Sequence, residues 1–380
     1  KFLRICHLNN CATGIATQDE RLRRDHFQGD PEAVIRDIRS IAQEVREWLA
    51  LLAARSLDEV IGQTRLLKLL PGETLQQHRL DLVPLLTNGG VDADKPHRCL
   101  IERNDSFDKA ELAEQMLADI KPSILARKSS IHQYILDNSN RSIGARVSGE
   151  IARHHGNNAM EKTPVKVFCQ GTAGQSFGVW NAGGLHLYLE GDANDYVGKG
   201  MAGGRISIYP PLIGGFASEA NVIIGNTCLY GATGGTLYAS GQAGERFAVR
   251  NSGATAVVEG VGDHCCEYMT GGVVTVLGGT GINFGAGMTG GFAYVLDLDD
   301  GLAQRLNSEF VDLHRMDDSS GCAPHCRLLR ATIEDFVTET RSVWAKSILD
   351  NFEVYLDKFL VVKPIAHEFA SLVESFDSAA

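Results

Sequence analysis

The chain has 380 residues, a net charge of −11 and 44% hydrophobic residues, which is the balance of a soluble globular protein of about two domains. The acidic charge argues against a general nucleic-acid-binding protein, because such a protein needs a basic face to meet phosphate. The sequence has no run of eighteen apolar residues, no apolar signal region in KFLRICHLNN and no initiator methionine. We therefore expect no membrane span, no signal peptide and a start inside a longer polypeptide.

Nine scattered cysteines, an odd number, indicate free thiols in a reducing compartment, and we expect a cytoplasmic protein. Two of them, Cys6 and Cys11, open the chain in CHLNNCATG. This C-x4-C pair lacks zinc-finger spacing and has no second pair nearby. The residues alone leave open whether it is part of a metal site, a redox pair or two ordinary thiols.

The first third of the chain is predicted to be helical. In DPEAVIRDIRSIAQEVREWLALLA, Asp30 is a good N-cap and Pro31 suits the first helical position. Apolar residues then recur every three or four positions, which predicts one amphipathic helix with an apolar face made of Val34, Ile38, Ile41, Val45, Trp48 and Leu52. In SLDEVIG, a capping box of Ser56 and Glu59 followed by Gly62 predicts a short second helix.

Residues 63–106 are mixed and polar, and we interpret them as a linker. Three further helices are predicted at 107–120, 129–138 and 147–156. In the last of these, His154 and His155 occupy a favourable cation position at the helix C-terminus.

The middle of the chain is rich in glycine, since thirty of the 41 glycines fall between residues 165 and 297. Short alternating strands are predicted at 165–168, 185–189, 205–209, 222–224, 236–240, 255–259, 273–277 and 292–296. Phrases such as NAGG, YGATGG and GAGMTGG precede several of them. A repeat of about 20 residues with glycine corners and no intervening helix is typical of a β-solenoid. We predict a mainly-β fold, a right-handed parallel β-helix of about seven coils.

The tail returns to a helical pattern in TIEDFVTETRSVWAKSILDNFEVYLDKF, and Pro364 closes this pattern after FLVVK. The helical tail either caps the open end of the solenoid or packs along its side.

Other motifs have ordinary explanations. GKGMAG (198–203) and GAGMTG (285–290) match the dinucleotide fingerprint, but a predicted strand follows each, where that site needs a helix. HCCE (264–267) and CAPHC (322–326) resemble halves of a zinc site, which buried or loop thiols explain better. Asp192, Asn194 and Asp195 could coordinate a cation, and turn chemistry explains them equally well. No self-contained active site is predicted.

Longer stretches resemble one family. CHLNNCATGIATQ (6–18) resembles the cluster-binding loop of glutamate synthase large subunits, which usually has the form CHLNTCPVGVATQ. The phrases GTAGQSFGVWNAGG, GDANDYVGKGMAGG, IGNTCLYGATGG, RFAVRNSGATAVVEGVGDH and INFGAGMTGGFAYVLD resemble that subunit's C-terminal glycine-repeat domain. The resemblance covers nearly the whole chain in order, and the CHLNNCATG form is most similar to the bacterial, NADPH-dependent branch.

This resemblance implies an enzyme that makes two L-glutamates from L-glutamine and 2-oxoglutarate. A glutaminase domain releases ammonia, and an FMN-containing (β/α)8 barrel uses it. A 3Fe-4S cluster delivers electrons from a small subunit that carries FAD and further iron–sulfur clusters. The implied partners are the glutaminase and synthase domains of the same chain and this small subunit, with no nucleic acid and no membrane, and an oligomer is compatible with the resemblance.

The resemblance also assigns parts of the chain. Residues 1–62 are the end of the synthase barrel with the cluster loop, 63–146 a linker with helices, 147–330 the glycine-repeat β-helix and 331–380 the helical tail. Cys6 and Cys11 match the second and third of three cluster ligands, C-x5-C-x4-C, and the first falls immediately before Lys1.

With two of three thiolates and most of the barrel absent, we expect this chain alone to bind neither the cluster nor FMN and to have no catalytic residue. The substitutions Asn10 for Thr and Ala12-Thr13 for Pro-Val leave both thiols in place.

Two alternatives remain. A stand-alone β-solenoid interaction module, like that in subunits of formylmethanofuran dehydrogenases, would share the glycine repeats but would lack the first 60 residues. An independent nucleotide-binding enzyme would require a helix after each glycine fingerprint.

Overall fold

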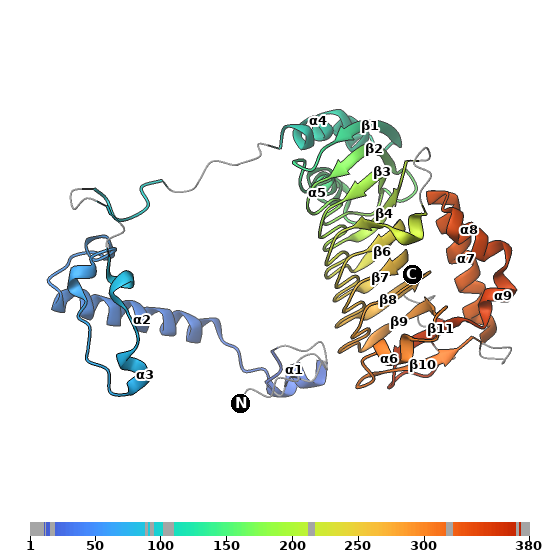
Figure 1. Cartoon of the computed structure of the whole chain (residues 1–380). Helices are drawn as coiled ribbons and strands as arrows, with labels where there is room; N and C mark the ends of the chain where they lie inside the picture. Colours follow the sequence, from blue (N-terminus) through green and yellow to red (C-terminus); the bar gives the residue numbers. More distant parts are fainter. Residues whose placement is uncertain are drawn as a thin grey trace. The chain divides into compact units, whose positions relative to one another are not determined.

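The computed structural model describes residues 11, 13–15, 20–87, 90–91, 95–101, 110–211, 217–316, 322–369 and 372–373 (Figure 1). The chain divides into two units, residues 24–107 and residues 1–23 with 108–380. A short helix, α1 (Glu20–His26), crosses the division. No helix in these ranges is both long enough and apolar enough to cross a membrane.

The unit of residues 24–107 contains the predicted amphipathic helix, α2 (Pro31–Leu51), which begins as expected. The Asp30 carboxylate accepts a hydrogen bond from the Glu32 backbone N–H at 3.2 Å, and Pro31 occupies the first turn. The rest of this unit is built of short turns: η2 (Leu57–Glu59), η3 (Thr64–Leu66), α3 (Leu75–His78) and η4 (Val83–Leu86).

The short helix predicted at SLDEVIG is wrong. It is only the single turn η2, and the Ser56 side chain makes no capping bond. Glu59 accepts instead from the Arg55 backbone N–H at 3.1 Å. Because Gly62 reverses the backbone at φ +69°, too few residues remain to repay the cost of starting an α-helix.

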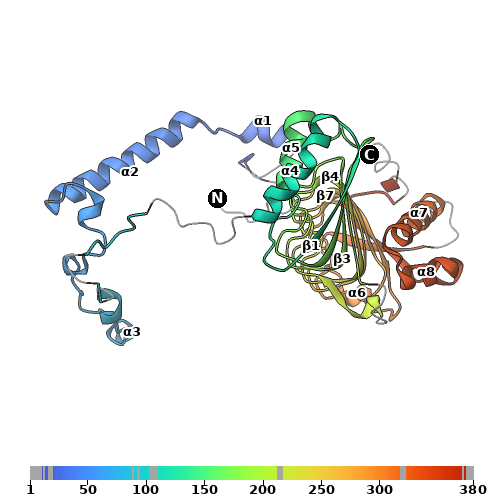
Figure 2. The same ribbon diagram turned by 90° about the horizontal axis from the view of Figure 1, so that it is seen from above.

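The predicted solenoid is confirmed, with about six turns in place of the seven or so coils expected from the sequence. After α4 (Glu111–Leu125), β1 (Ser130–Leu136) and α5 (Ala145–His155), the chain makes about six turns from strand to strand. The strands of these turns are β2 (Val165–Ala173), β3 (Leu185–Ala193), β4 (Ala202–Tyr209), β6 (Gly234–Ala243), β7 (Ser252–Val261), β8 (Thr270–Val276) and β9 (Gly290–Leu296). They lie over one another in Figure 2 and pair in parallel, while the short β5 (Val222–Ile224) pairs with β3 and β6.

Stacking in register produces the core inside the solenoid, which we call the inner core. Leu187 pairs with Val167 on one side and Ile206 on the other, so that like side chains form columns. Glycine is required where turns approach closely. At Gly191, with φ +150°, an added Cβ would overlap the Gly171 carbonyl oxygen of the preceding turn.

The prediction of a helix at 129–138 is wrong, because most of this segment forms the strand β1. Ile131, Gln133 and Ile135 are exposed while the residues between them are partly covered, and β1 pairs in parallel with β2. The apolar spacing of Ile131, Tyr134 and Ile135 fits a helix as well as a strand, and pairing with β2 decides between them.

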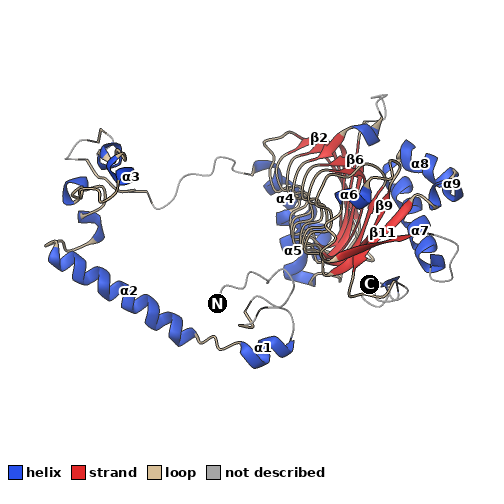
Figure 3. Ribbon diagram, turned by 60° about the horizontal axis from the view of Figure 1, so that its bottom comes forward, coloured by secondary structure: helices blue, strands red, loops and turns tan. Residues whose placement is uncertain are grey.

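The tail packs along the side of the solenoid and also adds a strand at its open end. Helix α7 (Cys322–Thr340) contacts the outer face of β4, β6 and β7, followed by α8 (Val343–Asp350) and α9 (Phe352–Leu356). These helices lie along the sheet in Figures 1 and 3. Beyond the short α6 (Leu302–Arg305), β10 (Val311–Arg315) and β11 (Phe359–Pro364) extend the sheet antiparallel at the β9 end. FLVVK is therefore a strand and not the end of a helix.

Between the sheet and the tail helices lies a second core, which we call the outer core. Its sheet side includes Tyr238, Val257, Val273, Phe292 and Tyr294, and its tail side Leu329, Ile333, Phe336, Ile348 and Phe352.

Candidate functional site

Of the predicted cluster loop, residues 6–18, the structure describes residues 11 and 13–15. The Cys11 side chain is 8% exposed, and its sulfur lies 3.2 Å from the Thr13 hydroxyl. The Gly14 N–H donates to the Cys11 carbonyl at 2.9 Å, which closes a tight turn. Cys6, the other predicted ligand, lies outside the described residues. A buried thiol beside a hydroxyl suits a metal-bound thiolate, because a hydrogen bond to sulfur adjusts the properties of a bound cluster.

The apolar face of α2 is the largest feature of the unit of residues 24–107. Val34, Ile38, Ile41 and Trp48 are all more than half exposed. None of the described residues of this unit is buried. Continuous exposed apolar surface of this kind marks a contact with another domain or chain.

The two glycine fingerprints are followed by strands, as predicted. GKGMAG runs into β4 and GAGMTG into β9, so neither places a helix N-terminus where a pyrophosphate would bind.

The corners instead contain a feature that the sequence reasoning missed. The buried Asn181 amide donates to the Leu185 and Gly203 carbonyls, each at 2.9 Å, and so ties one turn to the next. Asn251 donates to the Ala254 carbonyl at 2.9 Å in the same way within its own corner. The only sequence signal was an asparagine shortly before a glycine, which is also an ordinary turn signal.

The cysteine and histidine motifs are not brought together. Cys265 and Cys266 lie in the inner core, whereas His325 is buried in contact with the outer core, on the other face of the sheet. His325 Nδ1 lies 2.9 Å from the Tyr294 hydroxyl and Nε2 lies 3.1 Å from the Phe369 carbonyl oxygen. Burial lowers the pKa of His325. Within the described ranges, no three His, Cys, Asp or Glu side chains form a group that could hold a metal ion.

The polar residues of GDANDYVG make bonds between neighbouring segments. The Thr172 hydroxyl donates to Asp192 at 2.8 Å, and the Asn226 N–H donates to Asp195 at 2.7 Å. Asn194 donates to the Asn138 side chain at 2.9 Å. Hydrogen bonds between neighbouring segments therefore account for these residues.

The two histidines are bonded at the end of α5. His154 Nε2 lies 3.1 Å from Glu150, and His155 Nε2 lies 2.6 Å from the Ile124 carbonyl oxygen. The His155 imidazole thus ties α5 to α4, whereas the His154 contact lies within α5.

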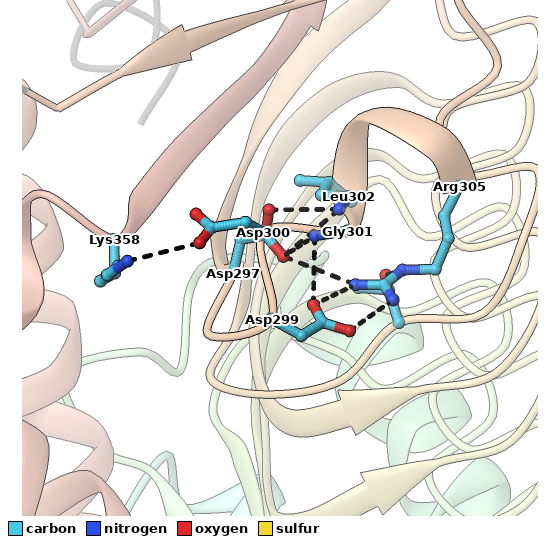
Figure 4. Close-up of polar contacts among 8 residues, drawn as sticks. Asp297, Asp299, Asp300, Gly301, Leu302, Arg305 and Lys358 are labelled. Carbon is cyan, nitrogen blue, oxygen red and sulfur yellow. Dashed lines mark hydrogen bonds and ion pairs between the residues drawn. The ribbon is translucent and has the colours of Figure 1, made fainter.

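A second acidic loop, Asp297 to Leu302, is closed by the chain's own groups (Figure 4). Asp297, which is almost fully buried, accepts from the Gly301 and Leu302 N–H groups, each at 3.1 Å. Arg305 binds both oxygens of Asp299, at 2.7 and 2.8 Å. Burial raises the pKa of Asp297, whereas hydrogen bonding to Arg305 lowers that of Asp299. The loop thus fixes the turn between β9 and α6.

Comparison with known proteins gives two family matches. The GXGXG motif model matches residues 110–365, and a model described as a conserved region in glutamate synthase matches residues 1–55. The chain is 48% identical to ferredoxin-dependent glutamate synthase 2 of Synechocystis sp. over 95% of this chain and 23% of the relative.

The names of two further relatives give other electron donors, NADPH and NADH. Identity is 44% to the glutamate synthase [NADPH] large chain of Azospirillum brasilense, over 96% of this chain and 24% of the relative. The chain is 42% identical to the glutamate synthase [NADH] of Schizosaccharomyces pombe, over 98% of this chain and 17% of the relative. The chain thus spans about a quarter or less of these relatives, and their similar identities do not select an electron donor.

Proposed function

The chain belongs to the GXGXG motif family, and we propose that it serves as the solenoid-bearing part of a glutamate synthase large chain. The proposal rests on two matches in one chain, a glutamate synthase region at residues 1–55 and the glycine-repeat region at 110–365. A stand-alone solenoid module would need only the second. The whole enzyme would convert L-glutamine and 2-oxoglutarate into two L-glutamates with reduced FMN.

In this proposal residues 1–62 complete the synthase domain. Cys6 and Cys11 are two of three thiolates that hold a 3Fe-4S cluster, and the cluster, when bound, supplies one-electron transfer toward FMN. Cys11 would bind iron through its buried sulfur, and the Thr13 hydroxyl would donate a hydrogen bond to that sulfur. The apolar face of α2 would pack against the remainder of the synthase domain.

The solenoid would act as a rigid spacer between the glutaminase and synthase domains. Its turns are joined by parallel strand pairing, and α7 packs over three of its strands. It would contribute structure and no catalytic group. The electron donor would be an FAD and iron–sulfur small subunit using NADPH, and the enzyme would work in the cytoplasm.

A chimera tests the proposal. The matching region of the Azospirillum brasilense large chain is replaced by this chain, and glutamate formation and the iron content of the purified protein are measured. We expect activity and a full cluster, both lost in a Cys11→Ser version of the same chimera. A folded chimera that retains FMN but binds no cluster would contradict the proposal.

A further inference from the structure

We propose that β1 is a docking edge, through which two copies of this chain pair antiparallel and continue the sheet across a two-fold axis. The proposal is independent of the enzyme activity. It starts from the sheet order, which runs from β1 at one end to β10 at the other. Within the described part of the chain, β2 is the only strand that pairs with β1.

The two edges of the sheet differ in how they are protected. The β10 edge, VDLHR, is five residues long and carries Asp312, His314 and Arg315. Charges on a short strand are the usual device that keeps an edge from pairing with another chain. The β1 edge, SIHQYIL, has seven residues with no charge, no proline and no glycine. Such a segment favours pairing with a further strand.

The β1 edge is also held ready for pairing. All seven residues are in register with β2, from Ser130 opposite Val165 to Leu136 opposite Gly171. The Tyr134 hydroxyl donates to Asp119 of α4 at 2.9 Å, which fixes the strand against that helix. On the outer face, Ile131 is 69% and Ile135 79% exposed. Two bulky apolar side chains on an uncharged edge are a liability unless another strand covers them.

The sequence of β1 is complementary to itself, which points to a second copy as the occupant. In an antiparallel pair centred on Gln133, Ile131 of one copy lies opposite Ile135 of the other. His132 lies opposite Tyr134, and Gln133 lies opposite its own counterpart, where each amide can both donate and accept. No like charges meet. A two-fold axis requires the same patch on both copies, and this register supplies it.

The association of the complete chain tests the proposal. Analytical ultracentrifugation from roughly 1 to 200 µM should show a concentration-dependent dimer. The double variant Ile131→Lys/Ile135→Lys places positive charges opposite one another, and we expect at least about tenfold weaker dimerisation. Val354→Lys, at a similarly exposed apolar position on α9, is the matched control and should leave the dimer unchanged.

Cysteine cross-linking tests the register, in a Cys99→Ser background because Cys99 is exposed. In this pairing the two Cα atoms at position 133 lie about 4.5 to 5.5 Å apart, within disulfide range. Gln133→Cys should therefore cross-link to itself. The two Cα atoms at position 131 lie about 14 Å apart, so Ile131→Cys should cross-link only when mixed with Ile135→Cys.

Three results would overturn the proposal. The first is a monomer at every concentration. The second is a dimer unaffected by the double lysine variant, which would place the contact elsewhere, for example on α2. The third is equal self-cross-linking at positions 131 and 133. Far-UV circular dichroism should show that each variant is folded, since the substituted side chains are exposed.

Discussion

Replacing Gly204 by alanine should destabilise the solenoid much more than the same change at Gly231. Both glycines lie at corners with left-handed backbone, at φ +71° and +65°. They differ in their surroundings. At Gly204 an added Cβ would overlap the Leu185 carbonyl oxygen and lie 2.6 Å from that of Ala182, whereas at Gly231 nothing lies within 4 Å.

The magnitudes follow from this difference. The left-handed conformation alone costs a residue with a Cβ about 1 to 2 kcal/mol, which is the whole effect expected for Gly231→Ala. At Gly204 the obstacle is backbone of the neighbouring turn, which no side-chain rotation can remove, and overpacking of this kind adds about 1 to 3 kcal/mol. We therefore expect Gly204→Ala to cost about 2 to 5 kcal/mol in total.

Urea unfolding of the complete chain, followed by far-UV circular dichroism, measures both values under one set of conditions. The comparison uses the difference between the two variants, so that the backbone cost common to both cancels. If Gly204→Ala were no more destabilising than Gly231→Ala, the close approach of stacked turns would not be what requires glycine at these corners.

Three further changes probe the tail, the buried Glu259 carboxyl group on β7 and the cluster loop. Phe336 is fully buried and meets the Tyr238 ring edge-on at 5.5 Å, so Phe336→Ala should cost about 3 to 5 kcal/mol and speed proteolysis of the tail helices, whereas Val354→Ala at an exposed site should not. Burial raises the pKa of Glu259 in the folded protein. The stabilisation that the protonated Glu259 carboxyl contributes is therefore fully present below the usual glutamate pKa and is lost as the pH rises through the raised pKa of the folded state. Glu259→Gln stays neutral, so the free energy of unfolding of this variant relative to wild type should be higher at about pH 8 than at about pH 5. The same difference at the two pH values would contradict this. In a cluster-loaded full-length enzyme, Thr13→Val removes the hydroxyl beside Cys11 and should lower the cluster's reduction potential, measured by a titration followed by electron paramagnetic resonance, without loss of iron.

The solenoid turns could be predicted because their signal is repeated. Each predicted strand between residues 165 and 296 lies within or overlaps an observed one, since alternating apolar residues and corner glycines recur at nearly constant spacing. The segment 129–138 shows the limit of this reasoning. Ile131 and Ile135 lie four residues apart, which suits one face of a helix, and no local pattern carries the pairing with β2. β11 was missed for the same reason, because FLVVK pairs with strands far away in the sequence.

The candidate site could be predicted only in part. The interpretation of Cys6 and Cys11 came from the resemblance, because a lone C-x4-C pair has no distinctive geometry of its own. The role of Asn181 could not be foreseen, because its amide reaches a carbonyl of the following turn. The partner of a residue that bonds between turns can be identified only when the stacking of the turns is known.

Polar contacts on the outer face of the sheet join the solenoid to its tail. Arg205 on β4 forms ion pairs with Asp335 at 2.9 Å and Glu339 at 2.6 Å, both on α7. The Tyr238 hydroxyl on β6 donates to the same Asp335 at 2.8 Å. Helix α7 therefore binds two neighbouring turns, those of β4 and β6, through polar side-chain contacts as well as through the outer core. Bending the stack at this point would separate β4 from β6 and break bonds to α7 at the same time, and this added resistance is what a rigid spacer between two domains requires.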